Sequence, residues 1–238
     1  GIRYVANNLR KALSSHSAKP GIPFALKIRV DYSPVGVVGV VTPWNYPLAL
    51  TMLDVIPALA AGNAVVQKAD DKTIQTIISA RDLAEANGLP KGLWQVVHGE
   101  NEIIGNGLID ACDYFAFTGS TQTGRRVAQR AAGRLIGYSM ELGGKNPAIV
   151  LPGANLEKTA ERLLASFIGN SGQLCVATER AYVPSEEMKA YVDLLEKKIE
   201  SLKLGSSGVF DHDLGALISS DQISRVGGFL ERARKGGS

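Results

Sequence analysis

Val35-Gly36-Val37-Val38-Gly39-Val40-Val41, at residues 35–41, is a continuous run of apolar residues. A run without polar alternation is typical of a strand that is buried on both faces of a sheet. Further strand-like runs, some with a polar residue, recur along the first half of the chain at residues 64–68, 93–97 and 114–117. Segments of helical length follow three of these four runs, at residues 48–61, 73–87 and 123–132. Strands that alternate with such helices predict an α/β fold with a doubly wound parallel sheet.

The rest of the chain is organised differently. Residues 1–16 have the pattern of an amphipathic helix, and residues 26–32 alternate as in a half-exposed strand at a sheet edge or subunit contact. Further strands are expected at 139–142, 148–151, 180–183 and 214–218, and further helices at 156–170, 188–202 and 221–234. We therefore predict three parts: an N-terminal helix with an edge or oligomerisation strand at 1–32, a dinucleotide-binding domain at 33–141, and part of a second α/β catalytic domain at 142–238.

Composition excludes several function classes. The 238 residues are 45% hydrophobic and 21% charged, which is ordinary for a globular protein. A net charge of +3 gives no field that favours nucleic acid or an anionic membrane as the main partner. The two cysteines, Cys112 and Cys175, belong to no closely spaced Cys/His set, so no metal site is expected. The absence of a signal-peptide core favours a cytoplasmic protein.

Polar and small residues follow three of the expected strands. Asn45 stands between two prolines, and a rigidly held amide there is suited to donate to an oxyanion. Lys68 ends the next strand and has carboxylates two and three positions on, which could together hold ribose hydroxyls. The small residues of Thr118-Gly119-Ser120 open a helix, where a phosphate can approach backbone N–H groups. A doubly wound sheet binds its ligand at these strand ends.

Residues 141 and 175 supply the reactive groups. Glu141 is followed at once by two glycines, and Cys175 ends Gly172-Gln173-Leu174-Cys175. Acyl-enzyme chemistry requires at least a nucleophile, such as a thiol, and a general base. Taken singly, each candidate also has an ordinary structural interpretation, such as a turn Asn, a solvated loop Lys, a capping Glu or a buried Cys. The candidates other than Cys175 share a position at or near the ends of expected strands, which favours the functional interpretation. Cys175 then follows in the second domain.

Five motifs in this order resemble the NAD(P)-dependent aldehyde dehydrogenases. They are Thr42-Pro43-Trp44-Asn45, Lys68, Phe117-Thr118-Gly119-Ser120, Glu141-Leu142-Gly143-Gly144-Lys145 and Gly172-Gln173-Leu174-Cys175. The resemblance covers essentially the whole chain. It implies that Cys175 is the nucleophile, that Glu141 is the general base, and that Asn45 donates to the oxyanion together with the Cys175 backbone N–H.

The resemblance also implies a bound NAD or NADP. The implied cofactor-binding residues are Thr42, Pro43, Trp44, Asn45, Lys68, Asp71, Gly99, Phe117, Thr118, Gly119, Ser120, Leu142 and Gly143. The implied reaction oxidises a small-molecule aldehyde to an acid through a cysteine thiohemiacetal and thioester. Likeness in residues 180–183 and 214–219 favours the bacterial succinate-semialdehyde dehydrogenases, with succinic semialdehyde as substrate. A homodimer or tetramer is implied for the full-length enzyme.

The sequence departs from the family pattern in three ways. Ala69 stands where members commonly have Pro after the cofactor lysine. Asp71 stands where many members carry a ribose-binding Glu, and a carboxylate there disfavours a 2′-phosphate, which favours NAD over NADP. Members are also considerably longer, so the chain resembles a central fragment. Two alternatives stay open: a CoA-acylating aldehyde dehydrogenase, and a catalytically incomplete fragment that only binds cofactor.

Overall fold

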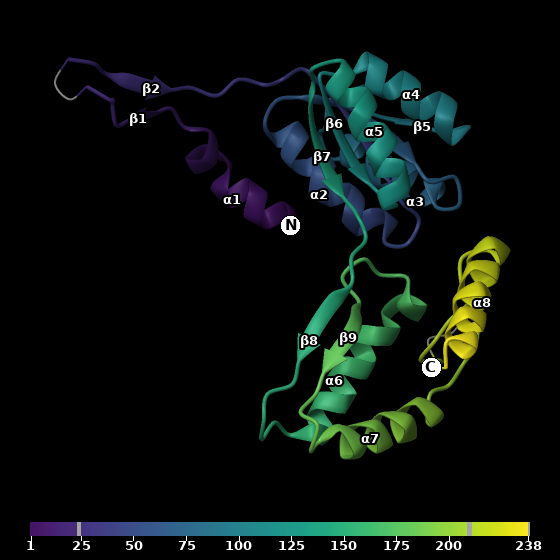
Figure 1. Ribbon diagram of the computed structural model, residues 1–238. Coiled ribbons are helices and arrows are strands. Elements are labelled where there is room, and N and C mark those ends of the chain that lie inside the picture. The colour runs from purple at the N-terminus through teal and green to yellow at the C-terminus, as the bar shows by residue number, and fades with distance from the viewer. Residues whose placement is uncertain (23–24, 209–210, 238) are drawn as a thin grey trace. The chain divides into compact units, whose positions relative to one another are not determined.

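A computed structural model describes residues 1–22, 25–208 and 211–237. The chain divides into two compact units, residues 1–142 and 143–238. Figure 1 identifies their helices and strands. In the part of the chain that the structure describes, no helix is long and apolar enough to cross a membrane.

The first unit contains a five-stranded, wholly parallel sheet with the strand order β5-β4-β3-β6-β7. Its strands are β3 (Val37–Thr42), β4 (Ala64–Ala69), β5 (Trp94–Val97), β6 (Tyr114–Thr118) and β7 (Gly137–Glu141). From β3 the chain adds β4 and β5 on one side, and later adds β6 and β7 on the other. The doubly wound parallel sheet is therefore confirmed, and its topological switch point lies between β3 and β6.

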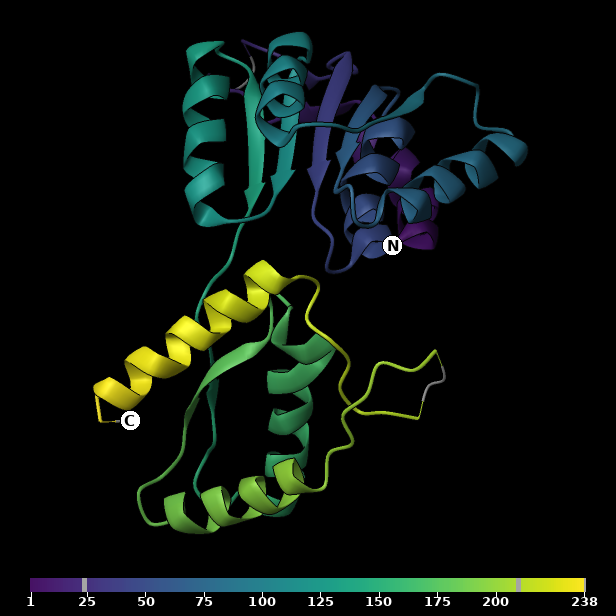
Figure 2. The same ribbon diagram turned by 90° about the vertical axis from the view of Figure 1, so that its right-hand side faces the viewer.

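Helices cover both faces of this sheet, as Figure 2 shows. They are α2 (Pro47–Ala60) and α3 (Ile74–Ala86), which pack together, and α4 (Asn101–Ala111) and α5 (Thr121–Gly133), which form a second pair. The sequence prediction missed α4. Two glycines within it, Gly105 and Gly107, lower its intrinsic helix propensity. Its buried residues Leu108 and Ile109 pack on the sheet, so tertiary burial stabilises the helix instead.

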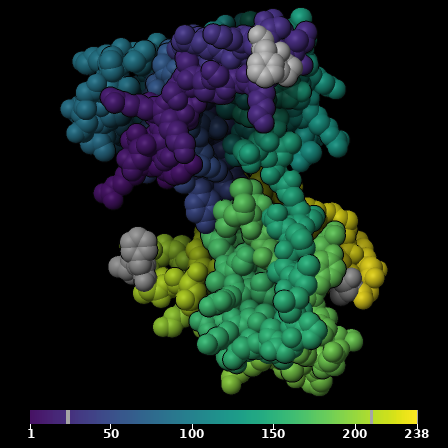
Figure 3. All heavy atoms as spheres, turned by 90° about the vertical axis from the view of Figure 1, so that its left-hand side faces the viewer, coloured from purple at the N-terminus to yellow at the C-terminus, as the bar shows by residue number. Residues whose placement is uncertain are grey.

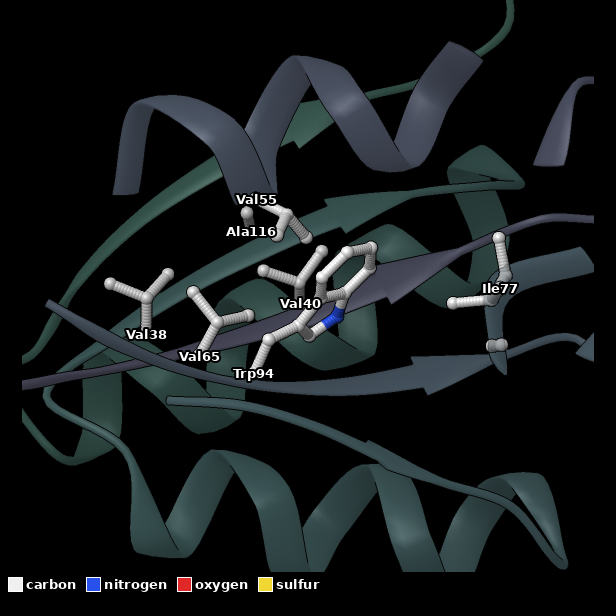
Figure 4. Close-up of a cluster of buried hydrophobic side chains, with 8 residues drawn as sticks. Val38, Val40, Val55, Val65, Ile77, Trp94 and Ala116 are labelled. Atoms are coloured by element: carbon white, nitrogen blue, oxygen red, sulfur yellow. The ribbon is translucent and has the colours of Figure 1, made fainter. Parts of the chain in front are cut away.

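Each face of the sheet has its own hydrophobic core. Between the sheet and the pair α2 and α3, Val55 and Ile77 pack against strand residues that include Val40 and Trp94 (Figure 4). On the other face, α4 and α5 pack over a cluster centred on Phe115. The unbroken apolar run at 35–41 follows from this arrangement, because β3 is covered by helices on both faces.

The N-terminal segment has a helix and a two-stranded sheet (Figure 1), and its atoms are coloured purple in the space-filling view of Figure 3. Helix α1 (Ile2–Leu13) confirms the expected N-terminal helix. Strand β2 (Ile28–Val30) falls within the expected strand and pairs antiparallel with β1 (His16–Ala18), which the sequence analysis did not anticipate. Ile28 is exposed.

The second unit has a two-stranded parallel sheet and three longer helices. Its elements are β8 (Asn146–Ile149), α6 (Leu156–Ile168), the short 3₁₀ helix η1 (Gly169–Gly172), β9 (Thr178–Tyr182), α7 (Met188–Glu200) and α8 (Ser220–Lys235). The strand predicted at 214–218 is wrong, because only Leu214 makes a single bridge, to Leu204. Its neighbours bond to the loop before residue 175 instead: Ser171 Oγ donates to the Gly215 carbonyl, and Ile218 N–H donates to the Gln173 side chain.

Candidate functional site

A cavity of about 430 Å³ opens at the carboxyl ends of β3, β4 and β6 in the first unit. This is where a doubly wound sheet is expected to bind its ligand. Seven of the predicted cofactor residues line it: Thr42, Pro43, Trp44, Lys68, Phe117, Thr118 and Gly119. The cavity therefore gathers residues from three separate sequence motifs.

Lys68 is held at the cavity by hydrogen bonds to its own strand end. Its side chain is only 2% exposed, and Nζ donates to the Ala69 carbonyl at 2.9 Å and to the Asp71 carboxylate at 3.2 Å. The hydrogen bond from Lys68 is the largest cause that lowers the pKa of Asp71, and the backbone of Gly99 adds to it. Lys68, Asp71 and Gly99 are thus brought together, although Asp71 and Gly99 do not line the cavity itself.

The β6–α5 turn brings a helix N-terminus to the same place. Ser120 is the N-cap of α5, and its Oγ accepts a hydrogen bond from the Thr123 backbone N–H at 3.2 Å. A Cβ at Gly119 would lie 2.6 Å from the Phe117 ring, so this position requires glycine. Because helix N-termini present backbone N–H groups and a positive dipole end, the turn can receive a phosphate.

Glu141 ends β7, next to this turn. Its backbone carbonyl accepts a hydrogen bond from Gly119 N–H at 3.0 Å, and its side chain is exposed. The pKa of Asp54, on α2, is raised mainly by burial and also by the negative charge of Glu141. Leu142, the next residue, packs against α5, where a Cβ on Gly124 would come within 2.7 Å of it.

Asn45 lies in the β3–α2 loop, half-buried between Pro43 and Pro47. Pro47 is the first residue of α2, where its fixed φ suits the start of a helix. The two prolines limit the backbone freedom on either side of Asn45.

A buried polar network connects β3, β4, β5 and α2. Gln67 Nε2 donates to Thr42 Oγ1 at 2.8 Å and to Thr51 Oγ1 at 2.7 Å, and Gln67 Oε1 accepts from Trp94 Nε1 at 3.0 Å. Because Gln67 and Thr51 are fully buried, these bonds have no competition from water. The network fixes the strand ends that carry Thr42 and Lys68.

Cys175, in the second unit, follows an unusual backbone segment. Asn170, Ser171 and Gly172 all have positive φ, at 51°, 57° and 76°. Cys175 is exposed, and its carbonyl accepts a hydrogen bond from Asn146 Nδ2 at 2.7 Å. The same Asn146 amide donates to Ala177 O at 2.9 Å, so it holds the loop from both sides of Val176.

The second cysteine is placed very differently. Cys112 is buried in the core of the first unit, where burial raises the pKa of its thiol. Of the predicted residues, Asn45, Glu141 and Leu142 belong to the first unit, and Gly143 and Cys175 to the second.

Sequence reasoning missed the helix residues that complete the cavity. Asn101, Glu102 and Asn106 of α4 and Arg126 of α5 line it. The α4 residues were missed with their helix. The apolar spacing of Ile104, Leu108 and Ile109 is the signal that could have found that helix.

Comparison with known proteins agrees with the sequence pattern. The chain matches the Aldehyde dehydrogenase family over residues 1–238, and it belongs to that family. It is 42% identical over 235 residues to a Mycobacterium tuberculosis protein named "Putative succinate-semialdehyde dehydrogenase (NADP(+)) 2", covering 99% of this chain and 45% of that protein. The chain thus spans about half the length of the curated relatives it matches. The family predicted from the five motifs is confirmed.

Solved structures give the same result. A crystal structure of an E. coli NADP dependent enzyme matches with a TM-score of 0.90 and 32% identity, covering 95% of this chain and 47% of that one. Betaine aldehyde dehydrogenase from Staphylococcus aureus in complex with NAD+ matches with a TM-score of 0.88 and 30% identity, covering 94% of this chain and 44% of that one. The fold of this chain is that of aldehyde dehydrogenases.

Proposed function

We propose that this chain carries the cofactor site, nucleophile and base of an NAD(P)-dependent enzyme that oxidises an aldehyde to a carboxylic acid. The observation that supports this most is the cavity, where the strand-end motifs Thr42-Pro43-Trp44, Lys68 and Phe117-Thr118-Gly119 come together. The names of the relatives favour succinic semialdehyde as the substrate and succinate as the product.

The cavity residues fit a nicotinamide dinucleotide. Lys68 with Asp71 offers a donor and an acceptor suited to ribose hydroxyls, and the α5 N-terminus suits the pyrophosphate. Gly105 lines the cavity, and nothing lies within 4 Å of the position that its Cβ would take, so open space adjoins its backbone. When bound, the cofactor accepts a hydride at the nicotinamide C4.

Cys175 is the proposed nucleophile because it is exposed, whereas Cys112 is buried. Its thiolate adds to the aldehyde carbon to form a C–S bond, and the carbonyl electron pair moves to the oxygen. The Asn45 amide donates to that oxyanion, a type of contact whose removal typically weakens transition-state stabilisation by ~3 kcal/mol. Loss of the hydride from the same carbon leaves an acyl thioester on Cys175.

Glu141 then acts as general base. It takes a proton from a water molecule whose oxygen attacks the thioester carbon. The C–S bond breaks, the thiolate of Cys175 is restored, and the carboxylic acid leaves. A CoA-acylating enzyme would not need this base, because a thiol and not water would take the acyl group. The presence of Glu141 therefore favours hydrolysis.

The test is formation of reduced nicotinamide by the purified chain. NAD and NADP are supplied in parallel, with succinic semialdehyde and a plain aliphatic aldehyde as substrates. We expect turnover with succinic semialdehyde, its loss in Cys175→Ala and its retention in Cys112→Ala, the matched cysteine control. Turnover that survives Cys175→Ala would overturn the proposal. A chain that binds cofactor without turnover would support the alternative of a cofactor-binding fragment.

A further inference from the structure

Three arginines form a stripe at α5: Arg126 and Arg130 within the helix, and Arg134, its C-cap residue. Their spacing of four residues places them on one side of the helix. Arg130 binds the carboxylate of Asp110 on α4, and Arg134 Nη1 donates to backbone carbonyls at the end of α4, including that of Cys112 at 2.8 Å. Two of the three arginines thus connect α5 to α4 and have a structural role.

Arg126 differs from the other two. It is exposed, it lines the cavity, and within residues 1–22, 25–208 and 211–237 it makes no ion pair or side-chain hydrogen bond. Thr123 and Val127 line the cavity from the same face of α5. A guanidinium that faces a cavity without a protein partner points to an anionic ligand, because Arg is suited to bidentate binding of phosphate.

The other charges around the cavity narrow the choice. Lys68 is already bonded to Asp71 and the Ala69 carbonyl. Asp70 and Glu102 line the cavity with negative charge, which disfavours a further anion. Arg126 is therefore the cation of the lining that remains available.

The position of Arg126 along α5 indicates which phosphate group of the cofactor it contacts. The pyrophosphate is expected at Ser120, the N-cap of α5. Arg126 lies six residues further on, roughly 9 Å along the axis at 1.5 Å per residue. It therefore faces a different part of the ligand. In a dinucleotide, the remaining phosphate is the 2′-phosphate, which NADP has and NAD lacks.

We propose that Arg126 is a cofactor-specificity residue that binds the 2′-phosphate of NADP, against the opposing charges of Asp70 and Glu102 in the cavity lining. The inference rests on the proposed function, since it requires the cavity to be the dinucleotide site. It reconciles an expectation from the sequence with the names of the relatives. The sequence analysis expects Asp71 to favour NAD, whereas the mycobacterial relatives are named as NADP(+) enzymes.

The experiment measures equilibrium binding by the complete chain, without turnover. The ligands are NADP, NAD, 2′,5′-ADP and 5′-AMP, with calorimetry and tryptophan fluorescence as readouts, because Trp44 lines the cavity. We expect Arg126→Gln to weaken the binding of NADP and 2′,5′-ADP by about tenfold or more, which is the usual contribution of a charge-assisted hydrogen bond. The affinities for NAD and 5′-AMP should change by less than about twofold. Glu102→Gln should strengthen NADP binding.

Arg125→Gln is the matched control. It removes the same charge from the neighbouring position of α5, and Arg125 does not line the cavity. Equal weakening of both ligand pairs in Arg126→Gln would overturn the inference, since the residue would then contact a part that NAD and NADP share. If the wild-type chain binds NAD but not NADP, the inference about Arg126 is overturned, whereas the proposed cofactor site is not. Failure to bind either dinucleotide would overturn the proposed cofactor site as well.

Discussion

Replacement of Gln67 by Met tests the buried polar network around Gln67. Gln67 is fully buried and makes three side-chain hydrogen bonds, to Thr42, Thr51 and Trp94. Met has a similar shape, so Gln67→Met removes the polar ends without a large cavity. The Trp94 N–H, on a side chain that is 1% exposed, then loses its acceptor.

The magnitude follows from these contacts. A buried donor left without a partner destabilises by about 1–3 kcal/mol, and each lost neutral hydrogen bond by about 0.5–1.5 kcal/mol. The two threonine hydroxyls lie 3.5 Å apart and can partly satisfy each other. We therefore expect Gln67→Met to lower the free energy of unfolding of the first unit by about 2–4 kcal/mol.

Urea unfolding followed by fluorescence measures this change, because both tryptophans, Trp44 and Trp94, lie in the first unit. A double-mutant cycle with Trp94→Phe, followed by circular dichroism, isolates the orphaned N–H. Trp94→Phe should destabilise less in the Gln67→Met background than in the wild type, by about 1–2 kcal/mol. A decrease in the free energy of unfolding below about 1 kcal/mol for Gln67→Met would contradict the stabilising role of the network. Identical effects of Trp94→Phe in both backgrounds would contradict the contribution of the Gln67–Trp94 hydrogen bond.

Three further predictions concern the core, the two cysteines and the pH dependence of stability. Gly39→Ala should lower the free energy of unfolding in urea by about 1–3 kcal/mol, because the added Cβ would lie 2.9 Å from a ring carbon of Phe115. An unchanged free energy of unfolding would contradict this packing. In the folded chain a thiol reagent should modify Cys175 at once and Cys112 only on unfolding, because burial raises the pKa of the Cys112 thiol; rapid reaction of both would contradict this. The pKa of Asp71 is lowered chiefly by the hydrogen bond from Lys68, so its contribution to stability is present above the unfolded pKa and is lost as the pH falls through the lower folded value. Asp71→Asn should therefore narrow the stability difference between neutral and acidic pH, and an unchanged pH profile would count against the ion pair.

The sequence predicted the sheet of the first unit well, for a physical reason. Strands that are buried on both faces, such as β3 and β6, consist almost entirely of apolar residues, so their sequences differ clearly from those of exposed strands. Helix α4 lacked such a signal because Gly105 and Gly107 weaken its propensity, and long-range packing stabilises it. The cavity residues on α4 were consequently not predicted.

The second unit shows the opposite error. Residues 214–218 have the composition of a strand, but Ser171 and Gln173 take up backbone groups of this segment that a ladder would need. A short apolar segment does not reveal whether its hydrogen-bond partners are a strand or a loop. The strand-end residues at the cavity, such as Thr42 and Lys68, could be predicted because parallel strands bring their carboxyl ends to one edge.

Trapping the acyl-enzyme tests the proposed partnership of Cys175 as nucleophile and Glu141 as general base. The Glu141→Ala chain is mixed with NADP and succinic semialdehyde, and intact-mass and peptide analysis follow the cysteines. We expect one reduced nicotinamide per chain and a persistent acyl group on Cys175, because the water that would release the acyl group lacks its base. Repeated turnover by this variant, or an acyl group on any residue other than Cys175, would contradict the proposed mechanism.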